Sequence, residues 1–195
     1  MAFKKNYIYE VIVEIDTGVK KNFAPMGIKY LGMKGRNRKF EIFVFKNADT
    51  ARLLTENLNK GLNEKRNFKS FAAIWTSDIR YFYECITKKF SGDFCNKIEK
   101  FPKVVFEIEK VEESDNGLNV VCVPKYIDRE TEKDIRKNLI NRAKYLALES
   151  LIYYTKPIAN DKKKEKISEA LRAIKKVAPD SDCEKLVSDL LLKMK

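Results

Sequence analysis

A succession of short strand-like segments separated by turn residues most strongly limits the folds open to this chain. YIYEVIVEI at residues 7–15 is rich in β-branched and aromatic residues, and Asp16-Thr17-Gly18 marks a turn after it. We expect a second extended segment from about Asn22 to Met33 and a third strand, KFEIFVF, at residues 39–45. Three consecutive strands predict a meander or the wall of a barrel.

The later part of the chain carries three more strand signals. FKSFAAIWT at residues 68–76 has the character of a buried strand. VVFEIEKVEE at 104–113 and GLNVVCVPKYI at 117–127 lie on either side of Asp115-Asn116-Gly117. Because Asn-Gly is the favoured residue pair of a type I′ turn, these two segments predict a hairpin with that turn.

Helical patterns interrupt the strands. Asp49 suits an N-cap, leucines follow at 53, 54 and 58, and Gly61 marks a stop, so we predict a helix here. A second, short helix is expected at residues 78–90, DIRYFYECITKKF, with its aromatic residues packed on the sheet.

From Thr131 onward the pattern is helical. Thr131 and Asp134 resemble a capping box, and an apolar stripe predicts one helix that ends near Thr155. The stripe consists of Ile135, Leu139, Ala143, Leu146 and Leu151. Two shorter helices are expected at about 161–177 and 182–194, the second starting at Ser181 with Glu184.

These patterns predict an α+β fold in which a six-strand β unit carries helical insertions and is extended by a C-terminal helical region. We expect residues 1–128 to form the β domain. Residues 129–195 would form the helical region, packed on the first domain.

The chain of 195 residues contains no histidine, which excludes Ser-His-Asp and Cys-His nucleophile activation and H-E-x-x-H metal sites. The four cysteines are scattered without a C-x-x-C pair, so we predict free thiols and no metal site. They are Cys85, Cys95, Cys122 and Cys183. No phosphate-loop, dinucleotide or calcium-loop motif is present.

No run approaches the ~18 consecutive apolar residues of a membrane span, and the start, Met-Ala-Phe-Lys-Lys, lacks the apolar core of a signal peptide. We therefore expect a cytoplasmic protein without a membrane partner.

The formal net charge of +12 leaves a nucleic-acid-binding protein as an alternative. Basic residues gather at Lys34, Arg36, Arg38 and Lys39 and at Lys162–Lys164, but the charge is spread along the chain and no RNA-binding signature is present.

Two segments could contact a ligand. At residues 45–50 a strand passes into a helix whose first N–H groups suit a phosphate, with Lys46 and the Thr50 hydroxyl beside them. The alternative is that Asp49 and Thr50 only cap the helix. In NFAPMG, residues 22–27, the small side chains and Pro25 could let a planar ligand lie against the backbone, or could simply mark an edge strand or bulge.

These segments also carry a family resemblance. YIYEVIVEIDTG, NFAPMGIKY, FEIFVFKNADTARLL, FAAIWTSD and the later NRAKYLALESLIYYT resemble an archaeal family of unknown function within the flavin-reductase-like, FMN-binding split barrels. The resemblance spans roughly residues 6–155.

The resemblance implies a six-stranded antiparallel split β-barrel that forms a homodimer and binds FMN near the subunit interface. Backbone at Ala24, Met26 and Gly27 would face the isoalloxazine ring. Lys46 and Thr50, which match the Lys-Asp-Thr element of flavin-reductase relatives, would hold the phosphate. Asn47 and Thr76, inside the matching segments, complete the predicted contacts. An oxidoreductase of this class could accept hydride from a nicotinamide nucleotide, NAD(P)H.

The chain departs from the family pattern at three positions. Ala48 and Leu53 replace a serine and an asparagine that are common near the threonine, and Ile74 replaces an asparagine of the FVVN-like strand. Phosphate and ring contacts are therefore weakened or rebuilt. Arg142, on the apolar stripe, would then bind the phosphate, pair with an acid such as Glu149, or reach to the surface.

The missing histidine agrees with this reading, because a flavin carries the redox chemistry and the protein binds and orients it. A third interpretation is a non-catalytic assembly protein whose C-terminal helices bind a partner, the alternative being that those helices cover the barrel.

Overall fold

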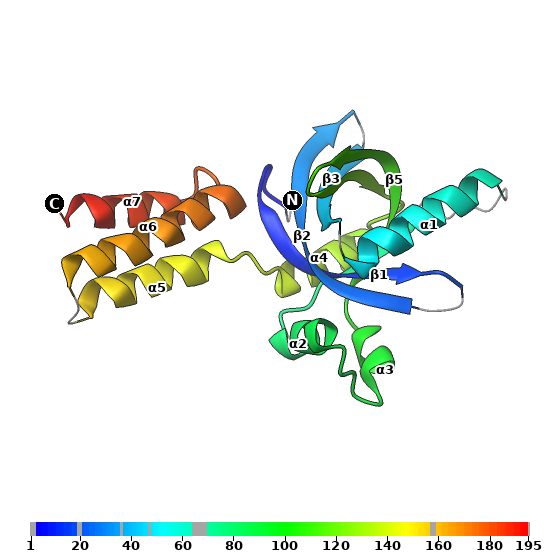
Figure 1. Ribbon diagram of the computed structural model, residues 1–195, viewed down its shortest axis with the longest axis horizontal. Coiled ribbons are helices and arrows are strands. Elements are labelled where there is room, and N and C mark those ends of the chain that lie inside the picture. The colour runs from blue at the N-terminus through cyan, green and yellow to red at the C-terminus, as the bar shows by residue number, and fades with distance from the viewer. Residues whose placement is uncertain are drawn as a thin grey trace. The chain divides into compact units, whose positions relative to one another are not determined.

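The computed structural model describes residues 3–18, 21–35, 37–46, 48–63, 70–156 and 159–194. Within them lie six strands and seven helices (Figure 1). The strands are β1 Ile8–Asp16, β2 Lys21–Lys34, β3 Asn37–Phe45, β4 Ser70–Ile74, β5 Lys103–Ser114 and β6 Gly117–Pro124. The helices are α1 Asp49–Asn63, α2 Ile79–Thr87, α3 Phe94–Ile98, α4 Arg129–Asn138, α5 Ala143–Thr155, α6 Asn160–Val177 and α7 Asp182–Leu192.

The strands close into an antiparallel barrel in the order β1-β2-β3-β6-β5-β4, which confirms the predicted six-stranded barrel. β6 pairs with β3 on one side and with β5 on the other, and β4 pairs with β1. Side chains alternate along β3: Ile42 and Val44 are fully buried, whereas Phe43 is 37% exposed and Phe45 is 68% exposed. This alternation is what a strand with one face in a core requires.

Aromatic rings fill the interior of the barrel. The ring of Phe40 lies 5.2 Å from that of Phe106 and 5.2 Å from that of Phe3, and the ring of Trp75 lies 6.1 Å from that of Phe106. Small closed barrels are commonly filled by their own side chains in this way. A ligand site would therefore lie on the outer surface of the barrel.

Helices α2 and α3 cover part of that outer surface. Phe94 and Ile98 of α3 and Cys85 of α2 form a buried cluster with Phe23 of β2 and with outward-facing residues of β1 and β4. Tyr81 and Phe82 of α2 pack against this cluster, as the sequence predicted, whereas Tyr83 is 65% exposed. The helix is shorter than expected, because α2 ends at Thr87.

The region predicted as one helix from 131 to 155 consists of two helices, α4 and α5. Leu139 is extended, and the carbonyl of Ile140 accepts a hydrogen bond at 2.9 Å from the N–H of Glu10 in β1. A bridge to a distant strand thus replaces helical hydrogen bonds at the break. The capping prediction was also wrong, because Asp128 caps α4 by accepting from the N–H of Thr131.

The β5–β6 hairpin is confirmed, but its turn is not of type I′. Ser114 pairs with Gly117, so Asp115 and Asn116 are the two turn residues and Gly117 begins β6. A type I′ turn needs positive φ at both central residues, and among the described residues other than glycine only Asn6, Lys88 and Asp180 have positive φ. The end of the first helix was predicted at Gly61 and was also wrong, because α1 continues to Asn63.

The chain divides into two compact units, one of Met1–Lys5 with Glu10–Ile140 and one of Asn6–Tyr9 with Asn141–Lys195. Helix α4 belongs to the first unit. The packing of a C-terminal region on the barrel stays a prediction.

In the second unit α5, α6 and α7 form a helical bundle around buried residues such as Ile167, Ile174 and Val187. Ser181 caps α7 by accepting from the N–H of Glu184, as predicted. No helix in the described segments is both long enough and apolar enough to cross a membrane.

Candidate functional site

The first half of β2 carries the segment that the sequence analysis selected as a wall for a planar ring. Residues 24–27 are each half-buried. The ladder between β2 and β3 starts at Ile28 and Ile42, so residues 24–27 precede it. This position suits Pro25, which has no N–H to donate to a neighbouring strand. Two interpretations of this segment therefore stay open. The part of β2 that contains Ala24, Met26 and Gly27 could be a strand edge, or it could be a surface that contacts a ligand.

Thr50, in the first turn of α1, joins this segment directly. Its side chain is buried, with 3% of the residue exposed. The side-chain amide of Asn22 donates a hydrogen bond to its hydroxyl, with 3.3 Å between Nδ2 and Oγ1. Asn22 is the first residue of NFAPMG. The two segments that the sequence selected separately, one for a ring and one for a phosphate, are therefore in contact.

Lys46 lies on another side of the start of α1. Its exposed ammonium group is 3.4 Å from the carboxylate of Glu113 in β5. Beside it lies a hollow of about 490 Å³ with the apolar side chains Ala51, Val111 and Leu118 in its lining. The contacts of Lys46 are thus with the β5–β6 hairpin, whereas Thr50 contacts β2.

A lysine that the sequence analysis missed also meets the β2 segment. Lys88, the C-cap of α2, donates from Nζ to the carbonyl of Phe23 at 3.1 Å and to Oδ1 of Asn22 at 3.4 Å. Thr50, Asn22 and Lys88 therefore form a continuous series of polar contacts. No local motif marks Lys88, because its partners lie 65 and 66 positions away in the chain.

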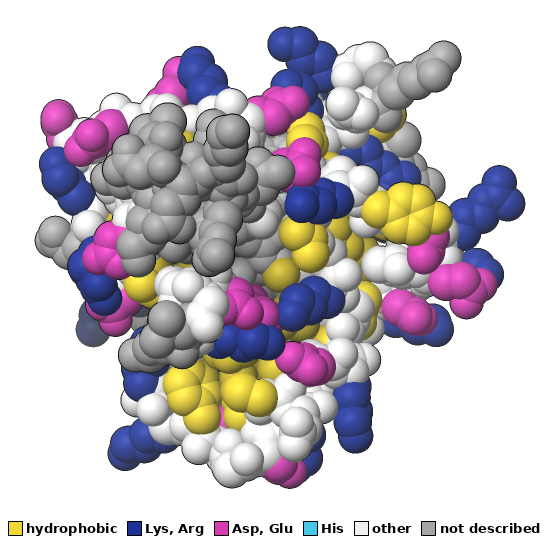
Figure 2. Space-filling view, turned by 90° about the vertical axis from the view of Figure 1, so that its right-hand side faces the viewer, with side chains coloured by type: hydrophobic (Ala, Val, Ile, Leu, Met, Phe, Trp, Pro, Cys, Tyr) yellow, Lys and Arg dark blue, Asp and Glu magenta, His cyan; other side chains and the backbone are white. Residues whose placement is uncertain are grey.

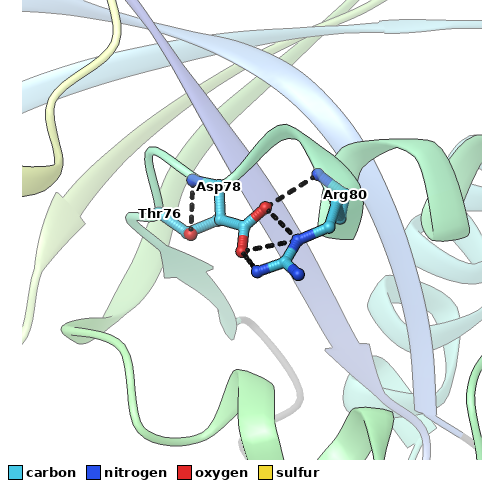
Figure 3. Close-up of polar contacts among 3 residues, drawn as sticks. All are labelled: Thr76, Asp78 and Arg80. Carbon is cyan, nitrogen blue, oxygen red and sulfur yellow. Dashed lines mark hydrogen bonds and ion pairs between the residues drawn. The ribbon is translucent and has the colours of Figure 1, made fainter.

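Thr76 is fully buried and takes part in the cap of α2 (Figure 3). Its hydroxyl accepts the N–H of Asp78 at 3.1 Å, and the Asp78 carboxylate accepts the N–H of Arg80 at 3.0 Å and also pairs with the Arg80 guanidinium. These bonds fix the first turn of α2, whose C-cap is Lys88. The predicted contact between Thr76 and a cofactor stays a prediction.

The cap of α2 gives a pH-dependent prediction. The guanidinium of Arg80 lowers the pKa of the Asp78 carboxyl below its ordinary value. A carboxyl whose pKa is lower in the folded state stabilises that state above its unfolded pKa, and the contribution is lost as the pH falls through the folded value. We expect Asp78→Ala to lower the free energy of unfolding by about 1 kcal/mol at neutral pH, with the difference from wild type shrinking below about pH 4.

Urea unfolding at several pH values measures this effect. Asp78→Asn is the matched control, because asparagine is an equally good N-cap but carries no charge. A difference between Asp78→Ala and wild type that stays constant down to low pH would contradict this role.

Arg142 is the N-cap residue of α5 and lies in the second unit. The prediction that Arg142 lies on the apolar stripe of one long helix was wrong, because the chain is not helical between Asn138 and Ala143. Its predicted contact with phosphate stays a prediction. Asn47, another predicted contact, lies outside the described residues.

The cysteines are free thiols. Burial raises the pKa of the Cys85 thiol to about 12 and also raises the pKa of Cys122, so both stay protonated at neutral pH. Across the described segments, no group of three or more Cys, Asp or Glu side chains is placed to hold a metal ion.

The basic residues near the β2–β3 turn are partly neutralised. Arg38 pairs with Glu132 at 2.7 Å and Lys39 pairs with Glu109. Arg36 lies outside the described residues. Figure 2 shows Lys and Arg side chains interspersed with Asp and Glu side chains on one face of the molecule. No observation in the described structure favours a nucleic-acid surface.

Comparisons with known proteins give similarities in structure. No family model matches the chain, and no curated protein matches it significantly. An FMN-bound protein of the DUF447 family from Methanosarcina mazei is 22% identical, with 100% of this chain and 97% of that chain covered and a TM-score of 0.42.

Two further solved structures have lower sequence identity. Flavoredoxin from Methanosarcina acetivorans is 12% identical, with 65% of this chain and 74% of that chain covered and a TM-score of 0.44. An FMN-binding protein from Thermus thermophilus with bound 1-cyclohex-2-enone is 14% identical. In this comparison 62% of this chain and 70% of that chain are covered, with a TM-score of 0.42. The barrel fold is established by the strand pairing and does not rest on these likenesses.

Proposed function

We propose that this protein binds FMN on the outer surface of the barrel, at the first half of β2 and the start of α1. The observation that carries the proposal is the hydrogen bond from Asn22 to Thr50, 3.3 Å long. This bond joins residues 22–27 of β2, which could contact the flavin ring, to the start of α1, which could bind the phosphate. Residues 28 positions apart in the chain are thus in direct contact.

The residues present fit a flavin nucleotide. Ala24, Met26 and Gly27 have no charged group and are half-buried, as contact with an apolar ring requires. The hydroxyl of Thr50 and the ammonium of Lys46 are groups that bind phosphate. Bound FMN would supply hydride and electron transfer, which agrees with a chain that has no histidine. The residues of this chain would hold and orient it.

The wider proposal is a cytoplasmic oxidoreductase resembling NAD(P)H:flavin reductases, with a nicotinamide nucleotide as electron donor and a homodimeric assembly. Phe43 and Phe45 on the outer face of β3 support the homodimer, because their rings are exposed and lie 5.0 Å apart, edge to face. An exposed aromatic pair suits an interface between subunits. Sedimentation of the purified protein tests the assembly, and oxidation of NAD(P)H in the presence of FMN tests the donor.

Replacing the Thr50 hydroxyl tests the site itself. We expect Thr50→Val to weaken FMN binding about tenfold, because one hydrogen bond to a charged phosphate is lost. Riboflavin, which lacks the phosphate, should bind the variant and wild type with nearly equal affinity. Quenching of flavin fluorescence on titration with protein measures both constants.

Thr55→Val is the matched control for this variant. In wild type the Thr55 hydroxyl also belongs to α1, but it donates to the carbonyl of Ala51 in the same helix, at 2.9 Å. An equal loss of FMN affinity in both variants would count against a specific role for Thr50.

A further inference from the structure

Lys88 is placed at the centre of the proposed cofactor site by contacts with the backbone and side chains of β2. An ammonium group has three N–H donors. Two of them point to amide oxygens, those of Phe23 and Asn22, at 3.1 and 3.4 Å. The third donor and the full positive charge are left for a further acceptor, since none of the ion pairs among the described residues involves Lys88.

The position of this charge relative to Thr50 is set by Asn22. The amide oxygen of Asn22 accepts from Lys88 and its amide nitrogen donates to Thr50. One side-chain amide thus separates the ammonium from the hydroxyl that we propose as a phosphate ligand. The lysine contact also fixes which way the Asn22 amide points.

Lys46, the lysine that the sequence predicted for the phosphate, is in a weaker position. Its side chain is 60% exposed, and its charge is opposed by Glu113 at 3.4 Å. An exposed and already paired ammonium loses much of its attraction for another anion to solvent and to its partner. Lys88 is also exposed, but its neighbours are the amide oxygens of Phe23 and Asn22 and not a carboxylate.

The backbone also holds Lys88 in place. Lys88 adopts the left-handed conformation, with φ of 55°, where it ends α2. Residues other than glycine adopt this conformation infrequently, and it directs the chain sharply away from the helix axis. The cap at Asp78 fixes the other end of α2, and Cys85, one turn before Lys88, lies in the buried cluster with Phe23.

We propose that Lys88, together with Asn22 and Thr50, forms a site for the phosphate monoester of the flavin nucleotide, with the Lys88 ammonium as its main positive charge. This inference rests on the proposed FMN binding. A phosphate oxygen would accept from the third N–H of Lys88, a charge-assisted hydrogen bond of the kind that binds phosphate strongly.

Titration with FMN and with riboflavin tests this site, using wild type and three variants. Lys88→Asn removes the charge while keeping a residue that tolerates the left-handed conformation. Lys88→Arg keeps the charge. Lys89→Asn is the matched control, because Lys89 is the next residue and is exposed like Lys88, but no hydrogen bond or ion pair of the described residues involves it.

We expect Lys88→Asn to weaken FMN binding about tenfold or more and to leave riboflavin binding unchanged. Lys88→Arg should retain most of the affinity, and Lys89→Asn should match wild type. Added salt should weaken FMN binding to wild type more than to Lys88→Asn.

Two results would overturn the inference alone. If Lys88→Asn binds FMN as wild type does, the phosphate is held elsewhere. If Lys88→Asn loses affinity for riboflavin and FMN equally, Lys88 supports only the shape of the ring wall. Wild-type protein that binds neither flavin would overturn the proposed function, and this inference with it.

Discussion

Gly117→Ala is expected to destabilise the barrel by about 3 kcal/mol, at the upper end of the cost of overpacking. A Cβ atom on Gly117 would lie 2.2 Å from the carbonyl oxygen of Val44 in β3. It would also lie 3.0 Å from Cζ of Phe43. The obstructing oxygen belongs to the backbone of the paired strand and cannot rotate away. Strands β3 and β6 would have to separate at the point where Phe45 pairs with Gly117.

Urea unfolding followed by tryptophan fluorescence measures this loss, because Trp75 is the single tryptophan and is fully buried. Gly92→Ala is the matched control. Nothing lies within 4 Å of a Cβ at that position, so we expect no loss and a gain of up to about 1 kcal/mol. Equal stabilities for the two variants would show that β6 does not approach Val44 as described.

Phe94→Ala is expected to lower the free energy of unfolding by about 3–5 kcal/mol. Phe94 is 1% exposed, and its ring centre lies 4.6 Å from that of Phe90, 5.3 Å from that of Phe23 and 5.8 Å from that of Tyr81. It is the residue on which α2, α3 and β2 converge. Its removal would leave a cavity next to α2, the helix whose C-cap is Lys88.

The same unfolding measurement applies, with Tyr126→Ala as the matched control. Tyr126 is 74% exposed, so the loss of its ring should cost about 1 kcal/mol or less. Limited proteolysis should in addition cleave the α2–α3 segment of Phe94→Ala faster than that of wild type, because local opening becomes easier. A variant as stable as Tyr126→Ala would contradict the account of this cluster.

Local sequence patterns predicted the strands well, because β-branched and aromatic runs between turn residues depend little on the rest of the chain. The order of strands was beyond those patterns. β6 lies between β3 and β5, and β4 closes on β1, so both depend on contacts between distant segments. The idea of a closed barrel came from the family resemblance.

The break between α4 and α5 shows how a tertiary contact overrides a helical pattern. The apolar stripe continued through Leu139 and Ala143, but Ile140 bonds to Glu10 instead. Asn141 was a usable signal, since asparagine is a frequent capping residue and its side chain accepts the N–H of Ala143 at 2.9 Å.

The candidate site was predicted in pieces. NFAPMG and the start of α1 each have local features that suggested a ligand, but the contact between Asn22 and Thr50 exists only in the folded chain. Lys88 had no such feature, because its position depends on the packing of α2 against β2. The prediction that Gly117 belongs to a type I′ turn was also wrong because of a contact between distant residues. A glycine is needed at this position because the backbone of Val44 approaches it closely.

Flavin retention tests the central claim most directly. The purified protein is incubated with excess FMN, passed through a gel-filtration column, and its visible absorbance is compared with its protein absorbance. We predict close to one flavin per chain in the protein peak. Folded protein that elutes without flavin would contradict the assignment of the β2 and α1 surface as an FMN site.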